Sequence, residues 1–264
     1  MENLKNKRLF LFDMDGTLYL GNRLYDFTEE LLNTIKSQGG KYIFMTNNSS
    51  KSVVDYIKKL DNLGIKAEYD DFMTSSQATA FYLNKHYKGK TLYVCGTESL
   101  KEELRRGGFE ITEDLNSVDV IVMGFDTELT FKKLHDVSYL LLTRKDIPYI
   151  ATNPDYVCPT EFGSVPDCGS VCDMLYNVSK RRPIFIGKPS KLMPELAMEK
   201  TGYLKEQTAV IGDRIYTDIK SGLNAGVTTI LVMSGETTYE ILEASEDKPH
   251  YVMSSAKEIL EALK

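Results

Sequence analysis

Short apolar runs alternate with amphipathic segments along most of the chain. The apolar runs have the length of buried strands, and the amphipathic segments repeat apolar residues at helical spacing. The first strand is predicted at Leu9–Phe12. The first helix is predicted at Thr28–Gln38, where Gly39 and Gly40 follow as a stop signal. This alternation predicts an α/β fold with a largely parallel sheet.

The same alternation continues through the rest of the chain. Further strands are predicted at Tyr42–Met45, Thr91–Cys95, Val118–Met123, Pro148–Ala151, Ile184–Ile186, Ala209–Ile211 and Thr228–Met233. Further helices are predicted at Lys51–Leu63, Leu100–Arg106, Lys132–Arg144, Ser170–Ser179, Leu192–Thr201 and Thr217–Asn224.

Four of the predicted strands end on residues that carry a charge or a hydroxyl group. Asp13 and Asp15 follow the first strand, and Thr46 follows the second. Lys188 and Asp213 follow two later strands. Ligands bind at the carboxyl ends of the strands in open parallel sheets. We therefore expect these side chains to meet in one crevice, although they are far apart in the sequence.

The segment between Ser50 and Lys188 is much longer than one crossover between parallel strands requires. It is predicted to contain an inserted domain. We expect a Rossmann-like parallel-sheet core in residues 1–76 and 183–264, and a smaller α/β cap domain in residues 77–182.

The acidic residues at the predicted sheet edge indicate a metal site. Asp13, Asp15, Asp213 and Asp218 would repel one another and raise one another's pKa values. A hard divalent cation relieves this repulsion, and Mg²⁺ combines carboxylate ligands with waters and substrate phosphate oxygens. Lys188 adds a positive charge for a phosphate group. The set predicts a metal-dependent site for a phosphoryl group.

The two acids of the first motif suit different steps of phosphoryl transfer. Asp13 is the natural nucleophile, because a carboxylate can form an aspartyl-phosphate intermediate. Asp15, two residues further on, faces another way and could protonate the leaving oxygen and later deprotonate a water.

The motifs that carry this chemistry resemble those of the haloacid dehalogenase-like phosphatase superfamily, in the same order. They are Asp13-Met-Asp-Gly-Thr-Leu18, Thr46-Asn47-Asn48, Lys188 and Gly212-Asp213-Arg214-Ile-Tyr-Thr-Asp218. Two further segments, Asn153-Pro-Asp155 and Gly124-Phe-Asp126, resemble the NagD and 4-nitrophenylphosphatase subgroup. That subgroup carries a large α/β cap, of the C2 type, between the second and third motifs.

The resemblance implies a role for each matching residue. Asp13 would be the nucleophile and a Mg²⁺ ligand, and Asp15 the general acid and base, with its backbone carbonyl on the metal. Lys188 would orient Asp13 and the phosphate. The remaining metal ligands would be Asp213 and Asp218. The substrate contacts would be Thr46, Asn47 and Asn48 in the second motif and Asn153 and Asp155 in the cap.

The predicted function is hydrolysis of a phosphomonoester on a small phosphorylated metabolite. A phosphotransferase or mutase would share the first half-reaction and stays open as an alternative. A receiver-like phosphoacceptor and a non-catalytic binding protein are weaker alternatives. Taken singly, each motif also has a structural explanation, since aspartates and asparagines cap helices and begin turns. Sugar phosphates, nucleotides, phosphoglycolate, glycerol phosphate and pyridoxal phosphate stay open as substrates.

Composition limits the partners. The net charge of −6 argues against a nucleic-acid surface. No apolar stretch approaches the roughly 18 residues of a membrane span, and the first residues lack the pattern of a signal peptide. The four cysteines form no C-x-x-C pair. We therefore expect a cytoplasmic enzyme with no membrane partner. The resemblance also suggests a homodimer formed through the cap.

Overall fold

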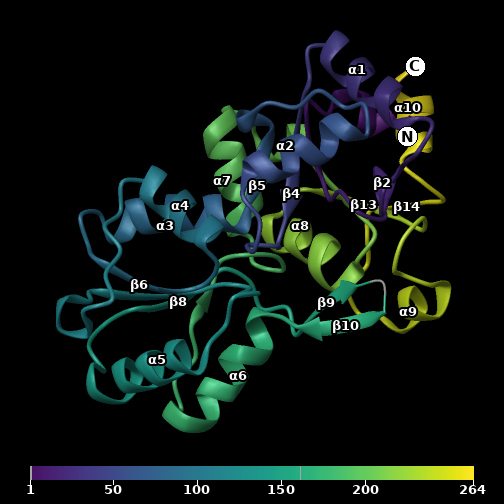
Figure 1. Ribbon diagram of the computed structural model, residues 1–264. Helices are drawn as coiled ribbons and strands as arrows, with labels where there is room; N and C mark the ends of the chain where they lie inside the picture. The colour runs from purple at the N-terminus through teal and green to yellow at the C-terminus, as the bar shows by residue number, and fades with distance from the viewer. Residues whose placement is uncertain (1, 161) are drawn as a thin grey trace. The chain divides into compact units, whose positions relative to one another are not determined.

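The computed structural model describes residues 2–160 and 162–264, and the chain forms two compact units (Figure 1). The first unit consists of Met1–Thr46, Tyr56–Met73 and Lys188–Lys264. The second unit consists of Asn47–Asp55 and Thr74–Gly187. Each unit contains a parallel sheet with helices, which confirms the predicted α/β class. The expected boundaries of a core and a cap domain stay a prediction.

The first unit is built on a six-stranded sheet with the order β14-β13-β12-β1-β4-β5. Its strands are β1 (Leu9–Phe12), β4 (Lys41–Thr46), β5 (Phe72–Thr74), β12 (Thr208–Gly212), β13 (Thr228–Val232) and β14 (Tyr251–Met253). All four residues of β1 are buried, as expected for a central parallel strand that is covered on both faces. Phe12 pairs with Ile211 of β12 and with Phe44 of β4, so the carboxyl ends of these three parallel strands lie at the same edge of the sheet.

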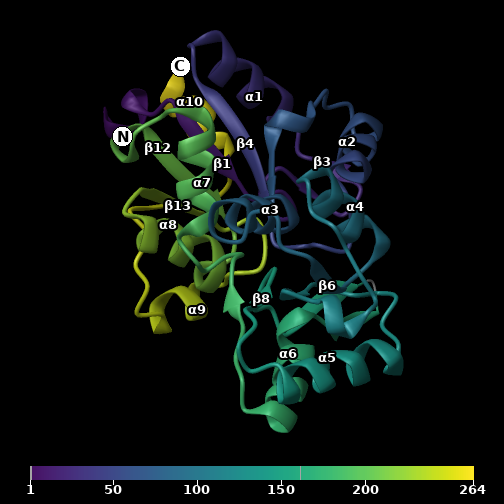
Figure 2. The same ribbon diagram turned by 90° about the vertical axis from the view of Figure 1, so that its left-hand side faces the viewer.

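Helices cover both faces of this sheet (Figure 2). Helices α7 and α8 contact each other on one face, and α1 and α10 contact each other on the other. The helices are α1 (Thr28–Ser37), α2 (Val53–Asn62), α7 (Leu192–Thr201), α8 (Lys220–Ala225), α9 (Tyr239–Ala244) and α10 (Lys257–Leu263). The smaller elements are a ribbon of β2 (Tyr19–Leu20) and β3 (Arg23–Leu24), 3₁₀ turns at Glu2–Asn6, Tyr69–Asp71 and Lys205–Gln207, and a π-helical turn at Ile215–Ile219.

The second unit has a parallel sheet of its own, with the order β11-β8-β7-β6. Helices α3 and α4 lie on one face and α5 and α6 on the other, as Figures 1 and 2 show. The strands are β6 (Leu92–Cys95), β7 (Val120–Met123), β8 (Tyr149–Ala151) and β11 (Ile184–Phe185). The helices are α3 (Ser75–His86), α4 (Glu98–Arg106), α5 (Phe131–Thr143) and α6 (Cys168–Ser179). A hairpin of β9 (Val157–Thr160) and β10 (Gly163–Pro166) and a 3₁₀ turn at Leu115–Ser117 complete the unit.

Every strand predicted from the sequence is present. The predicted helices are also present, with one difference, because the segment Thr217–Asn224 divides into the π-helical turn and α8. The α-helices and strands that the sequence did not predict are α3, α9, α10, β2, β3, β5, β9, β10 and β14, and the 3₁₀ turns were not predicted either. Within the described ranges, no helix is both long enough and apolar enough to cross a membrane.

Candidate active site

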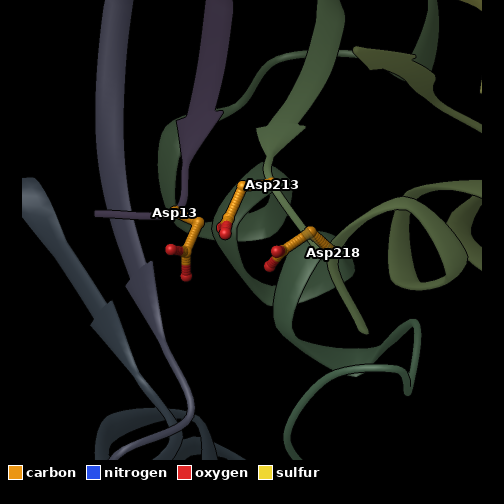
Figure 3. Close-up of side chains that lie close together, drawn as sticks. All are labelled: Asp13, Asp213 and Asp218. Carbon is orange, nitrogen blue, oxygen red and sulfur yellow. The ribbon is translucent and has the colours of Figure 1, made fainter. Parts of the chain in front are cut away.

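Three carboxylates meet at the carboxyl edge of the first unit's sheet (Figure 3). Asp13 directly follows β1, and its backbone N–H still donates to the carbonyl of Ile211 at 2.8 Å. Asp213 directly follows β12, and Asp218 lies in the π-helical turn after it. One oxygen of each carboxylate lies within 4.8 Å of the other two. The predicted convergence of these three acids is therefore present in the structure.

A glycine allows Asp218 to join this cluster. A Cβ atom on Gly212 would lie 2.4 Å from the Cβ of Asp218, which is closer than two non-bonded carbon atoms approach. Because Gly212 has no side chain, the π-helical turn can bring Asp218 back over the end of β12. Single π-helical turns are frequent at functional sites.

Lys188 lies between two of the three carboxylates. Its Nζ donates to Oδ1 of Asp13 at 2.6 Å and to Oδ1 of Asp218 at 2.5 Å, and it also contacts the carbonyl of Met45 at 3.4 Å. Only 3% of the Lys188 surface is exposed. Burial alone would lower the pKa of Lys188, but the carboxylates of Asp13 and Asp218 outweigh it and raise the pKa. The lysine is thus a fixed positive charge.

One lysine does not neutralise three acids. Burial, and then the charges of Asp13 and Asp218, raise the pKa of Asp213 to about 7. Burial also raises the pKa of Asp218 to about 6, although Lys188 acts in the opposite direction. The cluster therefore holds excess negative charge near neutral pH, which is the condition that a bound cation relieves.

The donor set fits a hard divalent cation. Among the described residues, Oδ1 of Asp213 is a buried oxygen with no hydrogen-bond partner. An unpaired buried carboxylate oxygen is costly unless a ligand completes it. With Asp13 and Asp218 beside it, the site offers the oxygen ligands that Mg²⁺ prefers.

Asp15 and Thr46, which were predicted to join this site, are not part of the three-carboxylate group. Asp15 is exposed, and its Oδ1 accepts a hydrogen bond of 3.3 Å from the backbone N–H of Gly21 in the turn between β2 and β3. Thr46 ends β4, two residues beyond the pair formed by Phe44 and Phe12. Their assigned roles stay predictions.

The two asparagines after Thr46 belong to the second unit. Nδ2 of Asn47 donates to Oδ2 of Asp155 at 2.9 Å. Oδ1 of Asn48 accepts from the backbone N–H and the hydroxyl of Ser50, at 2.9 and 2.8 Å, which is an Asx turn. The contact of both asparagines with a phosphoryl group stays a prediction.

Asn153 is fully buried in the second unit, within a chain of hydrogen bonds. Its Oδ1 accepts from the hydroxyl of Thr152 at 2.8 Å. Its Nδ2 donates to Oδ2 of Asp155 and to Oδ1 of Asp167, both at 3.1 Å. Both the oxygen and the nitrogen of the Asn153 carboxamide therefore have hydrogen-bond partners. The predicted substrate contact of Asn153 stays untested, and in this structure Asn153 orients Asp155.

Thr152→Val provides a test of this chain of hydrogen bonds. The Thr152 hydroxyl also lies 2.9 Å from the hydroxyl of Ser49, and both residues are fully buried. Valine would leave the Ser49 hydroxyl and the Asn153 oxygen without this partner, at a cost of about 1–3 kcal/mol. We expect a lower urea midpoint for Thr152→Val and a near-normal midpoint for Thr152→Ser. Equal urea midpoints for the valine variant and the wild type would contradict a stabilising role for the hydrogen bonds of the Thr152 hydroxyl.

The sequence did not indicate a fifth segment at the site, the Ser234–Thr237 loop that follows β13. The backbone N–H of Glu236 donates to Oδ2 of Asp213 at 2.7 Å. The donor is a backbone N–H, so no pattern of side chains in the sequence could predict this contact. Gly235, placed just after a predicted strand, was the only available signal.

Comparison with protein-family models gives two matches. A model described as haloacid dehalogenase-like hydrolase matches residues 10–110. A model described as HAD-hydrolase-like matches residues 185–259. The two matches contain all four motifs that were singled out from the sequence.

Similar proteins extend over nearly the whole chain. An acid sugar phosphatase of Staphylococcus haemolyticus is 34% identical over 248 residues, which is 94% of this chain and 93% of that protein. The crystal structure of a 4-nitrophenylphosphatase from Thermotoga maritima is 40% identical, has a TM-score of 0.94 and covers 99% of both chains. The structure of NagD from E. coli K-12 is 30% identical, has a TM-score of 0.87, and covers 96% of this chain and 98% of that one.

Proposed function

Because the chain belongs to the haloacid dehalogenase-like hydrolase family, in its NagD-like subgroup, we propose that it is a Mg²⁺-dependent phosphatase with Asp13 as nucleophile. The sequence-based prediction of this family is confirmed. The observation that carries the proposed mechanism is the buried Lys188, held between Asp13 and Asp218 beside the unpaired oxygen of Asp213.

In the first half-reaction, a carboxylate oxygen of Asp13 attacks phosphorus. The bond from phosphorus to the leaving oxygen breaks, and Asp15 donates a proton to that oxygen. The product is an aspartyl-phosphate on Asp13 and the free alcohol. Lys188 keeps the Asp13 carboxylate in place and supplies positive charge as negative charge builds on the phosphoryl oxygens.

In the second half-reaction, water attacks the phosphorus of the aspartyl-phosphate. Asp15 removes a proton from this water, and inorganic phosphate leaves while the Asp13 carboxylate is restored. The exposed position of Asp15 suits a group that exchanges protons with substrate and solvent. The hydrogen bond from Gly21 restricts its orientation.

Asp13, Asp213 and Asp218 would hold the Mg²⁺, with the backbone carbonyl of Asp15 as a further expected ligand. When bound, Mg²⁺ supplies charge neutralisation for the phosphoryl oxygens and for the attacking carboxylate. The pKa values of Asp213 and Asp218, raised to about 7 and about 6, support a cation there because burial and mutual repulsion both disfavour the empty, fully ionised cluster.

The proposed substrate contacts are the residues that the family motifs imply. Thr46 ends β4, and Asn47 and Asn48 follow it. The three residues would hold the phosphoryl group, as the family motif implies. Asp155, oriented by Asn153, would contact the rest of the substrate in a cap formed by the inserted segment. Assembly of a homodimer through this cap stays a prediction.

The proposed substrate class rests on the relatives, whose names include acid sugar phosphatase, 5'-nucleotidase and 4-nitrophenylphosphatase. We propose a small phosphorylated metabolite. Comparing kcat/KM over sugar phosphates, nucleoside monophosphates, phosphoglycolate, glycerol phosphate and pyridoxal phosphate would identify the class.

The proposed function predicts metal-dependent release of inorganic phosphate from 4-nitrophenyl phosphate. We expect chelation of divalent ions to abolish release and added Mg²⁺ to restore it, because the excess charge of the site is otherwise unrelieved. A mutase would transfer the phosphoryl group to an added sugar acceptor in place of water. A receiver-like protein or a binding protein would release no phosphate over many turnovers, and this outcome would overturn the proposal.

A further inference from the structure

The Ser234–Thr237 loop has no role in the family motifs described above, yet it contacts the metal-binding candidate Asp213 at two points. The backbone N–H of Glu236 donates to Oδ2 of Asp213 at 2.7 Å. The backbone N–H of Thr237 donates to the carbonyl of Asp213 at 3.2 Å. The loop therefore fixes both the carboxylate and the backbone of this residue.

Two glycines lie against the same carboxylate oxygen. A Cβ atom on Gly235 would lie 2.0 Å from Oδ2 of Asp213, and a Cβ atom on Gly16 would lie 2.6 Å from it. Both distances are shorter than any real contact of a Cβ atom. The φ angle of Gly16 is +82°, but Gly235 has no such left-handed φ. At Gly235 the requirement for glycine is thus one of space and not of backbone conformation.

The loop is attached to the segment after Asp213 by side chains as well. The hydroxyl of the buried Thr237 accepts from the backbone N–H of Ile215 at 3.2 Å. The carboxylate of Glu236 pairs with Nε of Arg214 at 2.8 Å and accepts from the hydroxyl of Tyr216. These links hold the loop in register with Asp213.

The loop is also attached to the turn of the first motif. The hydroxyl of Ser234 donates to the carbonyl of Gly16 at 2.6 Å. The hydroxyl of Tyr25 donates to the carbonyl of Ser234 at 3.0 Å. The loop therefore connects the turn that follows Asp13 to the segment that carries Asp213.

These contacts give the two carboxylate oxygens of Asp213 different surroundings. Oδ2 is held by the Glu236 amide and enclosed by the two glycines, while Oδ1 is buried and has no hydrogen-bond partner among the described residues. We infer that the Ser234–Thr237 loop is a positioning element that directs Oδ1 of Asp213 toward the cation. Glu236 and Gly235 act through Asp213. This inference depends on the proposed function.

The loop is tested by the Mg²⁺ affinity of two variants, measured by isothermal titration calorimetry. Gly235→Ala places a methyl group where Oδ2 lies, so the carboxylate must rotate or the loop must move. Loss of a contact that orients a metal ligand typically weakens metal affinity about 10- to 100-fold. We expect a weakening in this range, with kcat recovering at saturating Mg²⁺. A purely structural defect would not recover in this way.

Thr237→Val keeps the shape of the side chain and removes the hydroxyl that accepts from the Ile215 N–H. It provides a second test of the loop if Gly235→Ala does not fold. We expect weaker Mg²⁺ binding, restored by Thr237→Ser. Thr238→Val is the matched control, because Thr238 caps α9 through the Ile241 N–H and is outside the loop. Its Mg²⁺ affinity should equal that of the wild type.

Two outcomes separate this inference from the proposed function. Wild-type affinity in the folded Gly235→Ala and Thr237→Val variants would overturn the inference and leave the phosphatase mechanism standing. If the wild-type protein hydrolyses 4-nitrophenyl phosphate without a divalent cation and binds no Mg²⁺, the metal-dependent function fails and the inference fails with it.

Discussion

Replacing Asp13 with asparagine is expected to abolish turnover of 4-nitrophenyl phosphate while the protein stays folded. Asparagine has the shape of aspartate but is a poor nucleophile, so no aspartyl-phosphate can form. Loss of a nucleophile that acts together with its neighbours typically lowers kcat by a factor on the order of 10⁴ or more. Asp13→Asn also removes one negative charge from a crowded cluster. We therefore expect its thermal midpoint without metal to be no lower than that of the wild type.

Asp70→Asn is a suitable control for this variant. Asp70 lies in the same unit, in the 3₁₀ turn Tyr69–Asp71, and its exposed carboxylate pairs with Lys200. Its activity should be unchanged. Turnover by Asp13→Asn at the wild-type rate would contradict the assignment of Asp13 as the nucleophile.

Replacing Lys188 with methionine is expected to damage both activity and stability. Methionine fills a similar space but leaves the carboxylate of Asp218, of which 1% is exposed, without its cationic partner. Removing one member of a buried ion pair typically costs about 3–5 kcal/mol of unfolding free energy. The loss of a fixed charge at the transition state is expected to lower kcat by a factor on the order of 10²–10³.

These two effects are separated by measuring urea denaturation in the presence of a chelator and kcat at saturating Mg²⁺. Lys191→Met is the matched control, because Lys191 is exposed and pairs with Glu195 at the surface. Exposed pairs contribute about 0–1 kcal/mol, so this variant should behave like the wild type. If Lys188→Met showed the same small effects, Lys188 would not be the charge that organises the site.

The helices and strands of the core could be predicted because buried segments are rich in apolar residues. β1 is a run of four apolar residues, and all four are buried. Helix α3 was missed because its first six residues are buried on all sides and include serine, glutamine and threonine, which removes the amphipathic pattern. Its capping box of Thr74 and Gln77 was a usable signal. The hairpin of β9 and β10 is mostly exposed and contains two prolines, so it shows no alternating pattern.

The candidate site also contains some residues whose placement could be predicted and others whose placement could not. Asp13, Asp213 and Lys188 could be predicted because charged residues at the ends of apolar strands are unusual and their placement follows from parallel topology. The role of Gly235 could not be predicted, since it depends on a carboxylate from another strand lying 2.0 Å from where its Cβ would be. The hydrogen bonds of the Asn153 carboxamide to Asp155 and Asp167 could not be predicted either, since they depend on the tertiary structure.

The most direct test of the mechanism is to trap the phosphoenzyme. Asp15→Asn should accumulate it, because 4-nitrophenolate leaves without a proton while the attack of water still needs a base. After rapid quenching with acid, fragmentation of the phosphorylated peptide by mass spectrometry locates the phosphoryl group. The mechanism predicts phosphorylation on Asp13, in an amount equal to the burst of 4-nitrophenol. A burst without phosphorylated Asp13, or phosphorylation at another residue, would contradict it.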